Sequence, residues 1–387
     1  MKAAVAKLFR GDAVIWGVIA LLSIMSILAV YSSTGTLAFK YQEGNTLYYL
    51  TRHGALLFLG LVIIFITHRI PFNFYLKISK LLLYLCVPLL AWTLLKGTNL
   101  NEASRWMTLP GTGISFQTSD FAKFALILYI ARFLAQNQGN IKDFKTGFWS
   151  IMVWILIVCG LILPANFSTA VMLFGTSLIL LFLGRVQIKY ILSVIGIGIA
   201  GLAVFILVMV NLPEEKQGRI GTWKKRIENF VSGNSEDNFQ VEQSKIAIAT
   251  GGFFGKGPGN STQRNFLPHP YSDFIFAIII EEYGIFIPFG IIFLYILLFF
   301  RAGVIVRKSS SAFAAFLSMG LALSLIFQAF INMAVAVNLF PVTGQTMPLV
   351  SMGGTSIIFT SAAFGIILSV SQSVTKTPEH EQSEAKS

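Results

Sequence analysis

Long apolar runs separated by short polar segments dominate the chain. A helix needs about 20 apolar residues to cross roughly 30 Å of hydrocarbon, and spans are expected at residues 13–34, 51–68, 77–95, 116–135, 148–163, 167–184, 188–212, 273–301, 311–338 and 351–372. Between the fifth and sixth, Pro164-Ala165-Asn166 is either a turn or a break in one segment. The pattern predicts an all-α polytopic membrane protein with about ten transmembrane helices and both termini on one side.

The basic residues predict which side that is, because short cytoplasmic loops are rich in Lys and Arg. With the N-terminus in the cytoplasm, the short outer loops hold only Lys40, Arg52, Lys96 and Arg105. Both termini are therefore expected to be cytoplasmic, and residues 213–272 form a large extracytoplasmic loop between helices 7 and 8. Residues 1–374 are expected to be one transmembrane domain, followed by a disordered cytoplasmic tail at 375–387.

Composition agrees with this class and excludes others. The chain has 387 residues, of which 55% are hydrophobic and 12% charged, and its mean hydropathy of +0.72 excludes a soluble globular domain. Most of the net charge of +12 belongs to the cytoplasmic loops, so nucleic-acid binding is not expected. Two Cys in apolar runs and four scattered His predict neither a disulfide framework nor a zinc site.

Two segments of the outer loop have their own patterns. Between residues 219 and 231, apolar residues recur at helical spacing among basic ones, which predicts a helix in the membrane interface, either as an anchor or in contact with a substrate phosphate. The glycine-rich segment 251–259 lacks the residues of a P-loop. It is either a tight turn or a nest of backbone N–H groups that holds a phosphate.

Ionisable residues within apolar runs are costly to bury and usually mark function. Asp273 lies where the outer loop meets the eighth expected span, so it could act on a lipid-borne substrate or simply cap the helix. Glu281 follows on the same expected helix and could line the same cavity, while Glu282 is expected to meet a neighbouring helix. Asp120 and Lys123 are three residues apart on one helical face, either as a structural ion pair or as a cavity wall.

The last outer loop, residues 340–356, is uncharged and rich in Gly and Pro. Irregular backbone at this depth is tolerated only where it packs in protein or lines a wet cavity. We therefore expect this loop to fold back into the bundle beside Asp273.

Three blocks of sequence carry a family pattern. The first is Gln117 to Lys123, the second runs from Gln240 to the pair Glu281-Glu282, and the third comprises Pro341 to Gly344 and Ser351 to Ser356. In these blocks the chain resembles the SEDS proteins of bacterial shape, elongation, division and sporulation, represented by RodA and FtsW, and it is more similar to the division branch, FtsW. One departure is Asn166, where the family has an acid.

The resemblance implies a peptidoglycan glycosyltransferase that polymerises lipid II into β-1,4 glycan strands on the outer face of the bacterial cytoplasmic (inner) membrane, for septal synthesis in cell division. The reaction would invert the anomeric carbon and release undecaprenyl pyrophosphate. Implied partners are lipid II, a class B penicillin-binding transpeptidase and other division proteins.

The expected catalytic base is Asp273, since one carboxylate suffices for an inverting displacement. The positive charge that the departing pyrophosphate needs is available from Arg105, Lys123, the basic interfacial helix, or a divalent cation, Mg²⁺ or Mn²⁺, held partly by Asp273. The residues do not choose among these sources, and no other cofactor is expected. The residues expected to bind the substrate are Arg105, Gln117, Ser119, Asp120, Lys123, Gln243, Ser244, Glu281 and Ser351.

Two other functions are considered. A lipid II flippase would use a polar cavity around Asp120 and Lys123, but transport needs polar groups through the full depth of the membrane, and this chain gathers them in the outer half. A noncatalytic division scaffold would leave the intramembrane charges unexplained.

Overall fold

The computed structural model describes residues 9–384 except 97, 101–102, 109–114 and 212–235. Its long helices are α2 (Ala13–Ser33), α4 (Thr46–Thr67), α5 (Phe72–Lys96), α6 (Thr118–Gln136), α7 (Ser150–Ile162), α8 (Phe167–Leu183), α9 (Ile188–Asn211), α13 (Phe286–Lys308), α14 (Ala312–Ala336) and α15 (Ser356–Glu384). Shorter helices are α3 (Gly35–Tyr41), α11 (Glu236–Gly251) and α12 (Ile275–Tyr283), with a π-helical turn at Phe144–Trp149 and a 3-10 turn at Gln263–Asn265.

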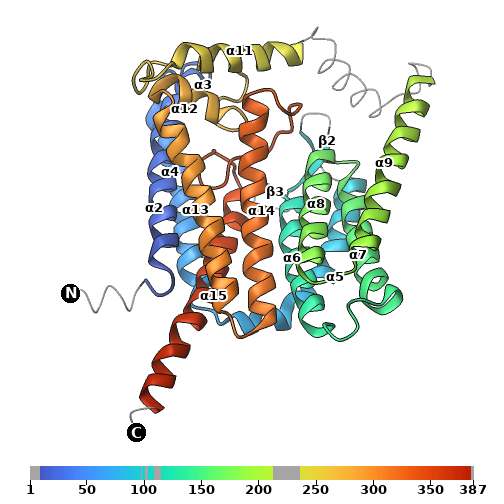
Figure 1. The fold of residues 1–387 in the computed structure, drawn as a ribbon. Coiled ribbons are helices and arrows are strands. Elements are labelled where there is room, and N and C mark those ends of the chain that lie inside the picture. The colour runs from blue at the N-terminus through green and yellow to red at the C-terminus, as the bar shows by residue number, and fades with distance from the viewer. Residues whose placement is uncertain (1–8, 97, 101–102, 109–114, 212–235, 385–387) are drawn as a thin grey trace.

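The long helices stand side by side in one bundle, and both chain termini lie at the same end of it (Figure 1). Helix α11 lies across the opposite end, with α12 beneath it (Figure 1). Most residues in the apolar stretches of α14 and of Ser356–Val374 in α15 are buried, whereas fewer than a third of those in α4, α5 and α13 are. Helix α14 is therefore central, packed against α6, α8, α13 and α15, and the outer helices present apolar side chains to lipid.

Local polar signals start several of these helices. The Asp12 carboxylate accepts hydrogen bonds from the backbone N–H groups of Val14 and Ile15 at 2.9 and 3.2 Å, and so caps α2. Asn45 caps α4 and Ser311 caps α14 in the same way. Each cap satisfies amide groups that the first turn of a helix leaves without a partner.

Seven of the described helices have the length and apolar composition to cross a membrane. They are α2, α4, α5, the helix from Phe144 to Ile162, α13, α14 and the segment Ser356–Val374 of α15; α8 and residues Ile188–Gly201 of α9 are shorter apolar helices. The chain is an integral membrane protein. The number of ten spans and the cytoplasmic side of the termini stay predictions. Pro164-Ala165-Asn166 forms a turn between α7 and α8, with the Asn166 N–H bonded to the Ile162 carbonyl at 2.8 Å.

The prediction that residues 273–301 form one helix, the eighth expected span, is wrong. This segment is divided into α12 and α13 at Gly284, whose φ of 68° is left-handed. The Phe253 carbonyl oxygen lies only 2.1 Å from the position of a Cβ at Gly284, so the outer loop occupies the space into which a side chain would project. The long apolar helix therefore begins at Phe286, and Asp273 lies in a turn before α12.

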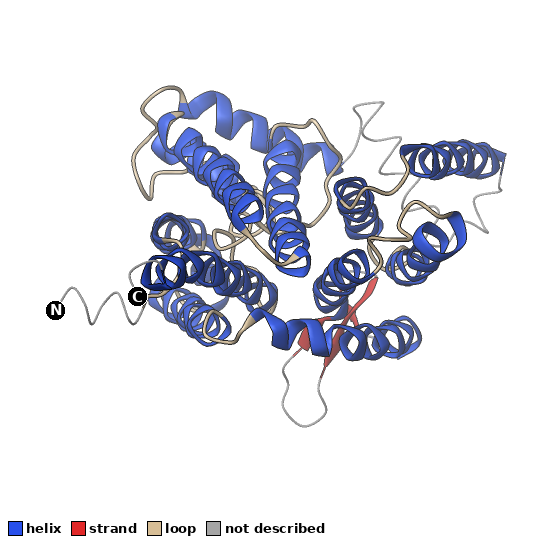
Figure 2. Ribbon diagram, turned by 60° about the horizontal axis from the view of Figure 1, so that its bottom comes forward, coloured by secondary structure: helices blue, strands red, loops and turns tan. Residues whose placement is uncertain are grey.

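A small antiparallel sheet precedes α6. Its strands are β1 (Thr98–Leu100), β2 (Ala103–Thr108) and β3 (Ser115–Gln117), in the order β1-β2-β3. Figure 2 shows the strands at the edge of the bundle. No strand is predicted from the sequence here, because such short segments show no clear alternation.

Two further expectations concern the ends of the described segments. The tail expected to be disordered from residue 375 is instead a continuation of α15 as far as Glu384, although this segment contains Pro378. The interfacial helix expected at residues 219–231 lies outside the described residues.

Candidate active site

The last outer loop, residues 337–355, folds back into the bundle and contacts the turn that holds Asp273, as expected. The Met352 N–H donates to the Tyr271 carbonyl at 2.9 Å, and the Ser351 hydroxyl donates to the Ser272 carbonyl at 2.7 Å. Because these bonds join residues about 80 positions apart, the loop and the turn have a fixed relative position.

Asp273 is half-buried in this turn. The Ser272 hydroxyl donates to its Oδ1 at 2.9 Å, which restricts the orientation of the carboxylate. The Asp273 backbone carbonyl accepts from Asn332 Nδ2 at 3.0 Å. The helix-cap interpretation is wrong, because the N-cap residue of α12 is Phe274 rather than Asp273, and the Phe274 side chain makes no capping hydrogen bond.

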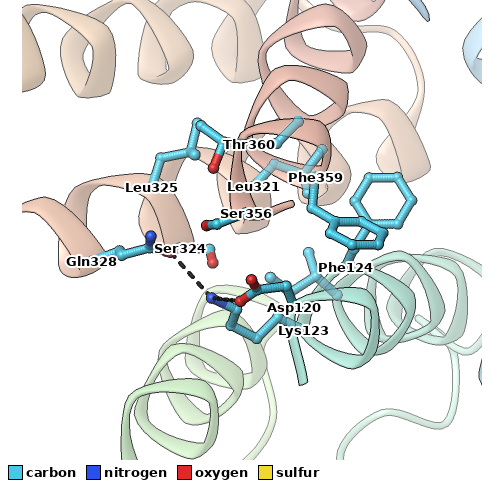
Figure 3. Close-up of a pocket in the computed structure, with 12 residues that line it drawn as sticks. Asp120, Lys123, Phe124, Leu321, Ser324, Leu325, Gln328, Ser356, Phe359 and Thr360 are labelled. Carbon is cyan, nitrogen blue, oxygen red and sulfur yellow. Dashed lines mark hydrogen bonds and ion pairs between the residues drawn. The ribbon is translucent and has the colours of Figure 1, made fainter. Parts of the chain in front are cut away.

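Asp120 and Lys123 form a buried ion pair at the start of α6. Lys123 Nζ lies 2.8 Å from Asp120 Oδ1 and 3.1 Å from Gln328 Oε1 of α14, so it lies between the two (Figure 3). Asp120 is in the first turn of α6, where the helix dipole favours negative charge. A Lys ammonium has three donors, so these two bonds leave one for another acceptor.

A narrow cavity of about 30 Å³ opens beside this pair, between α6, α14 and α15. Around Lys123 it is lined by the hydroxyl-bearing residues Ser324, Ser356 and Thr360 (Figure 3). Deeper along the helices, toward the termini, its lining is apolar and consists of Ile127, Leu321 and Ala363. The cavity thus combines one cation and several hydroxyl groups near the end of the bundle opposite the termini.

Asp273 and Lys123 are linked to the same face of α14. Gln328, which contacts Lys123, and Asn332, which contacts Asp273, are one helical turn apart, about 6 Å along the axis. The structure therefore brings the expected base and Lys123, one of the residues expected to bind the substrate, to one region, although they are far apart in sequence.

The other expected substrate-binding residues are distributed around this region. Gln117 donates to the Ser119 hydroxyl at 2.9 Å, and its N–H lies 3.4 Å from Thr355 Oγ1. The Ser244 hydroxyl on α11 donates to the Ala336 carbonyl at the end of α14, at 2.7 Å, while Gln243 is half-buried. Arg105 lies in β2 beside Trp106, which pairs with Gln117.

The expectation that Glu281 lines the same cavity as Asp273 is wrong. Its carboxylate is fully buried and accepts from Lys256 Nζ at 2.6 Å, the Ser261 hydroxyl at 2.5 Å and the Thr262 hydroxyl at 2.8 Å. These donors all belong to the outer loop, so Glu281 fixes that loop to α12. The expectation took Asp273 and Glu281 as residues of one helix, whereas Asp273 lies in the turn before Ile275, the first residue of α12.

The two adjacent acids of α12 have pKa values shifted in opposite directions. Burial alone raises the pKa of Glu281, but the hydrogen bonds from Lys256, Ser261 and Thr262 outweigh it and hold the pKa below its usual value. Burial raises the pKa of Glu282. Glu282 does meet a neighbouring helix, as expected, because the Ser32 hydroxyl of α2 donates to it.

The glycine-rich segment is a turn that caps α12. The N–H groups of Lys256 and Gly257 donate to the carbonyls of Glu281 and Glu282, both at 2.9 Å. A Cβ at Gly255 would lie 2.3 Å from the Glu282 carbonyl oxygen, so only glycine allows this approach. These two N–H groups are used within the protein, which favours the turn over a phosphate nest.

Sequence reasoning missed the two amides of α14. Gln328 and Asn332 lie in an apolar helix at a spacing of four, which places them on one face. Buried amides in a membrane helix need partners, so this spacing was an available signal. Their partners Gln345 and Thr346 belong to a loop that has no periodic pattern.

Comparison with known sequences gives matches along nearly the whole chain. The model of the FtsW, RodA and SpoVE family, described as a cell cycle protein, matches residues 12–376. The probable peptidoglycan glycosyltransferase FtsW of Trichlorobacter lovleyi is 31% identical over 96% of this chain and 96% of its own length. The probable peptidoglycan glycosyltransferase FtsW of Coxiella burnetii is 33% identical over 92% of this chain and 95% of its own length. Stage V sporulation protein E of Bacillus subtilis is 30% identical over 91% of this chain and 94% of its own length.

Solved structures share the fold. The rod shape determining protein RodA of Thermus thermophilus has a TM-score of 0.65 and 24% identity, covering 93% of this chain and 96% of that chain. A chain from a peptidoglycan synthase complex, described as coordinating polymerization and crosslinking, has a TM-score of 0.71 and 23% identity, covering 94% and 98%.

Proposed function

The chain belongs to the family of cell cycle proteins FtsW, RodA and SpoVE, and on this basis we propose that it is a peptidoglycan glycosyltransferase that polymerises lipid II. The observation that carries the proposal is the placement of Asp273 and the buried Lys123–Asp120 pair on one face of α14. One group can take a proton and the other can bind a phosphate. Both lie near the end of the bundle opposite the termini.

We propose an inverting displacement. The acceptor sugar's 4-hydroxyl gives its proton to the Asp273 carboxylate as its oxygen attacks the donor's anomeric carbon. The bond from that carbon to the pyrophosphate breaks, undecaprenyl pyrophosphate leaves, and a β-1,4 link forms. Lys123 offsets the charge that develops on the leaving group through its remaining donor.

A divalent cation is a further proposal. The described residues contain no cluster of three or more His, Cys, Asp and Glu side chains, so they form no closed metal site. Mg²⁺ is usually bound by one or two carboxylates together with substrate phosphates. Asp273 and the pyrophosphate oxygens could hold Mg²⁺ or Mn²⁺ in this way, and the cation would supply positive charge at the leaving group.

We also propose the setting of the reaction. The FtsW names of the relatives support septal synthesis in cell division, at the bacterial cytoplasmic membrane. The likeness to a chain of a peptidoglycan synthase complex supports a crosslinking partner, which we propose is a class B penicillin-binding transpeptidase. Other division proteins would assemble with this pair.

The flippase alternative is less well supported by the geometry. A transport path would continue past Lys123 toward the other end of the bundle, but there the lining of the cavity is the apolar Ile127, Leu321 and Ala363. A noncatalytic scaffold would need neither the ion pair nor the cavity. It would leave the buried charges unexplained, because burying a charge destabilises a fold unless the charge is paired.

The test is polymerisation of labelled lipid II by the purified full chain with a class B transpeptidase in detergent. Asp273→Asn should lower the rate by at least about 100-fold while the protein stays folded. Glu242→Gln, the same change at an exposed acid of α11, should leave the rate unchanged. Folded Asp273→Asn with full activity would refute the assignment. Loss of lipid II movement across sealed vesicles, with polymerisation intact, would favour the flippase.

A further inference from the structure

Helix α14 carries two buried amide side chains on the face that meets the candidate active site. Gln328 is 4% exposed and Asn332 is 1% exposed. Burying an amide is unfavourable unless its donors and acceptors find partners. The partners of these two side chains therefore indicate why amides occupy these positions.

Gln328 connects Lys123 to the loop between α14 and α15, residues 337–355. Its Oε1 accepts from Lys123 Nζ at 3.1 Å, and its Nε2 donates to the Thr346 carbonyl at 2.8 Å. Because an ammonium can only donate and a carbonyl can only accept, these partners fix the orientation of the amide. The Lys123 nitrogen is thus held relative to Thr346.

Asn332 connects the Asp273 turn to the same loop. Its Nδ2 donates to the Asp273 carbonyl at 3.0 Å and to the Gln345 carbonyl at 2.7 Å. Both acceptors are carbonyl oxygens, so the nitrogen must face them. The Oδ1 on the other side is buried and has no partner among the described residues, which is unfavourable. The side chain therefore contributes through its two donors.

The two amides use adjacent residues of the loop as a common support. Gln345 and Thr346 are consecutive, and the amides that bond to them are one turn apart on α14. Gln345 is itself held by the Thr169 hydroxyl of α8, to which its Nε2 donates at 2.6 Å. Movement of this short segment would therefore displace both Lys123 and Asp273.

We propose that Gln328 and Asn332 are positioning residues for the polymerisation reaction, Asn332 for the base Asp273 and Gln328 for the phosphate-binding Lys123. The inference rests on the proposed function. Through their shared support, the two amides set the spacing between the group that takes the proton and the group that stabilises the leaving pyrophosphate. Neither amide is assigned a contact with the substrate.

The alternative is that both amides only hold helices together, as polar side chains often do in membranes. The two roles predict different kinetics. A packing role predicts similar loss of stability and activity in both variants. Separate positioning roles predict that Asn332 affects the chemical step and Gln328 affects binding, because a phosphate contact is made in the ground state as well as in the transition state.

The experiment compares Asn332→Ala, Gln328→Ala and Ser318→Ala in lipid II polymerisation by the full chain with its transpeptidase. Ser318 is the matched control, because it is buried in α14 and its hydroxyl has no partner among the described residues. Asn332→Ala should lower kcat about 10- to 100-fold, with KM nearly unchanged. Gln328→Ala should raise KM about 10-fold, with a smaller effect on kcat. Ser318→Ala should match the wild type.

Equal changes of kcat and KM in the two amide variants, or wild-type kcat in folded Asn332→Ala, would overturn the proposal. If Asn332→Ala does not fold, Asn332→Ser, which keeps one hydroxyl donor, is assayed instead, and it should show the same selective loss of kcat. Failure of the proposed function is distinguishable, because the wild-type chain would then make no glycan strands from lipid II. Failure of the base assignment alone would appear as full activity in folded Asp273→Asn, whatever the amide variants do.

Discussion

Two adjacent carboxylates at the end of α12, Glu281 and Glu282, are both buried but are stabilised in different charge states. Glu281 is surrounded by donors from the outer loop, including the Lys256 ammonium. Glu282 has the Ser32 hydroxyl, the backbone of Gly259 and Ser261 and the more distant Arg264 charge, and its Oε2 has no hydrogen-bond partner among the described residues. Donors favour the ionised form of Glu281, whereas burial favours the neutral form of Glu282.

The residue-scale prediction is that Glu281→Gln destabilises the protein at pH 7 by roughly 2–3 kcal/mol, whereas Glu282→Gln changes stability by less than about 1 kcal/mol or raises it. Because the pKa of Glu281 is lowered on folding, its contribution is present above the unfolded pKa of about 4.3 and is lost as the pH falls through the folded pKa. Because the pKa of Glu282 is raised, its contribution is present below about pH 4.3 and is lost as the pH rises through the folded pKa.

Thermal unfolding in detergent at pH 7 and near pH 4 measures both effects. The difference in thermal stability between wild type and Glu281→Gln should be smaller near pH 4 than at pH 7. Equal losses of stability in Glu281→Gln and Glu282→Gln at pH 7 would contradict the prediction that the two carboxylates are stabilised in different charge states.

At the scale of elements, the junction between α12 and α13 determines where the outer loop meets the bundle. Gly284 ends α12 in a left-handed conformation, and the Ile285 N–H donates to the Phe253 carbonyl at 3.2 Å. The loop reaches this junction because Gly255 and Gly284 have no side chains. The long helix α13 begins after this turn, while Asp273 lies before α12, where Asn332 of α14 donates to its carbonyl.

The element-scale prediction compares two glycines in neighbouring positions. Gly284→Ala should destabilise the protein by at least about 2 kcal/mol, because a non-glycine residue is strained at this φ and its Cβ would meet the Phe253 carbonyl. Gly290→Ala, in the first part of α13 with open space around the position, should be neutral or stabilising by about 1 kcal/mol. Thermal shift in detergent measures both, and a tolerated Gly284→Ala would contradict the close approach.

At the scale of the whole molecule, the ends of the bundle differ. The termini lie at one end, while α11 and α12 lie at the other (Figure 1). If the charge rule is correct, the active site faces the outside of the cell, where lipid II would be polymerised. Cys86 and Cys159 are both buried, so introduced cysteines can be labelled with little background.

The whole-molecule prediction is that Glu43→Cys reacts with a membrane-impermeant maleimide on intact cells, whereas Lys142→Cys reacts only after permeabilisation. Both positions are exposed, and α4, α5 and α6 lie between them, so they should be on opposite sides of the membrane. If both introduced cysteines react in intact cells, the prediction that the chain crosses the membrane three times between residues 43 and 142 is contradicted. The reverse pattern would contradict a cytoplasmic N-terminus.

Part of the candidate site follows from short-range patterns. The spacing of Asp120 and Lys123 predicts their pairing, because residues three apart on a helix are neighbours whatever surrounds them. The Gly- and Pro-rich composition of residues 340–356 likewise predicts a loop that needs partners within the bundle. The same kind of reasoning fails for Glu281, because it places Asp273 on the same helix as Glu281, whereas α12 begins at Ile275.

The sequence alone determined the membrane class, most helix positions, the Asp120–Lys123 pair and the motifs of the family, because hydrophobicity, helical spacing and motifs are properties of neighbouring residues. Only the tertiary structure decided where α12 ends, that Glu281 serves the outer loop, and that Gln328 and Asn332 join Lys123 and Asp273 to one loop. These features depend on bonds between segments as far apart as Lys123 and Gln328. Such bonds form only when the helices pack, and no local pattern specifies them.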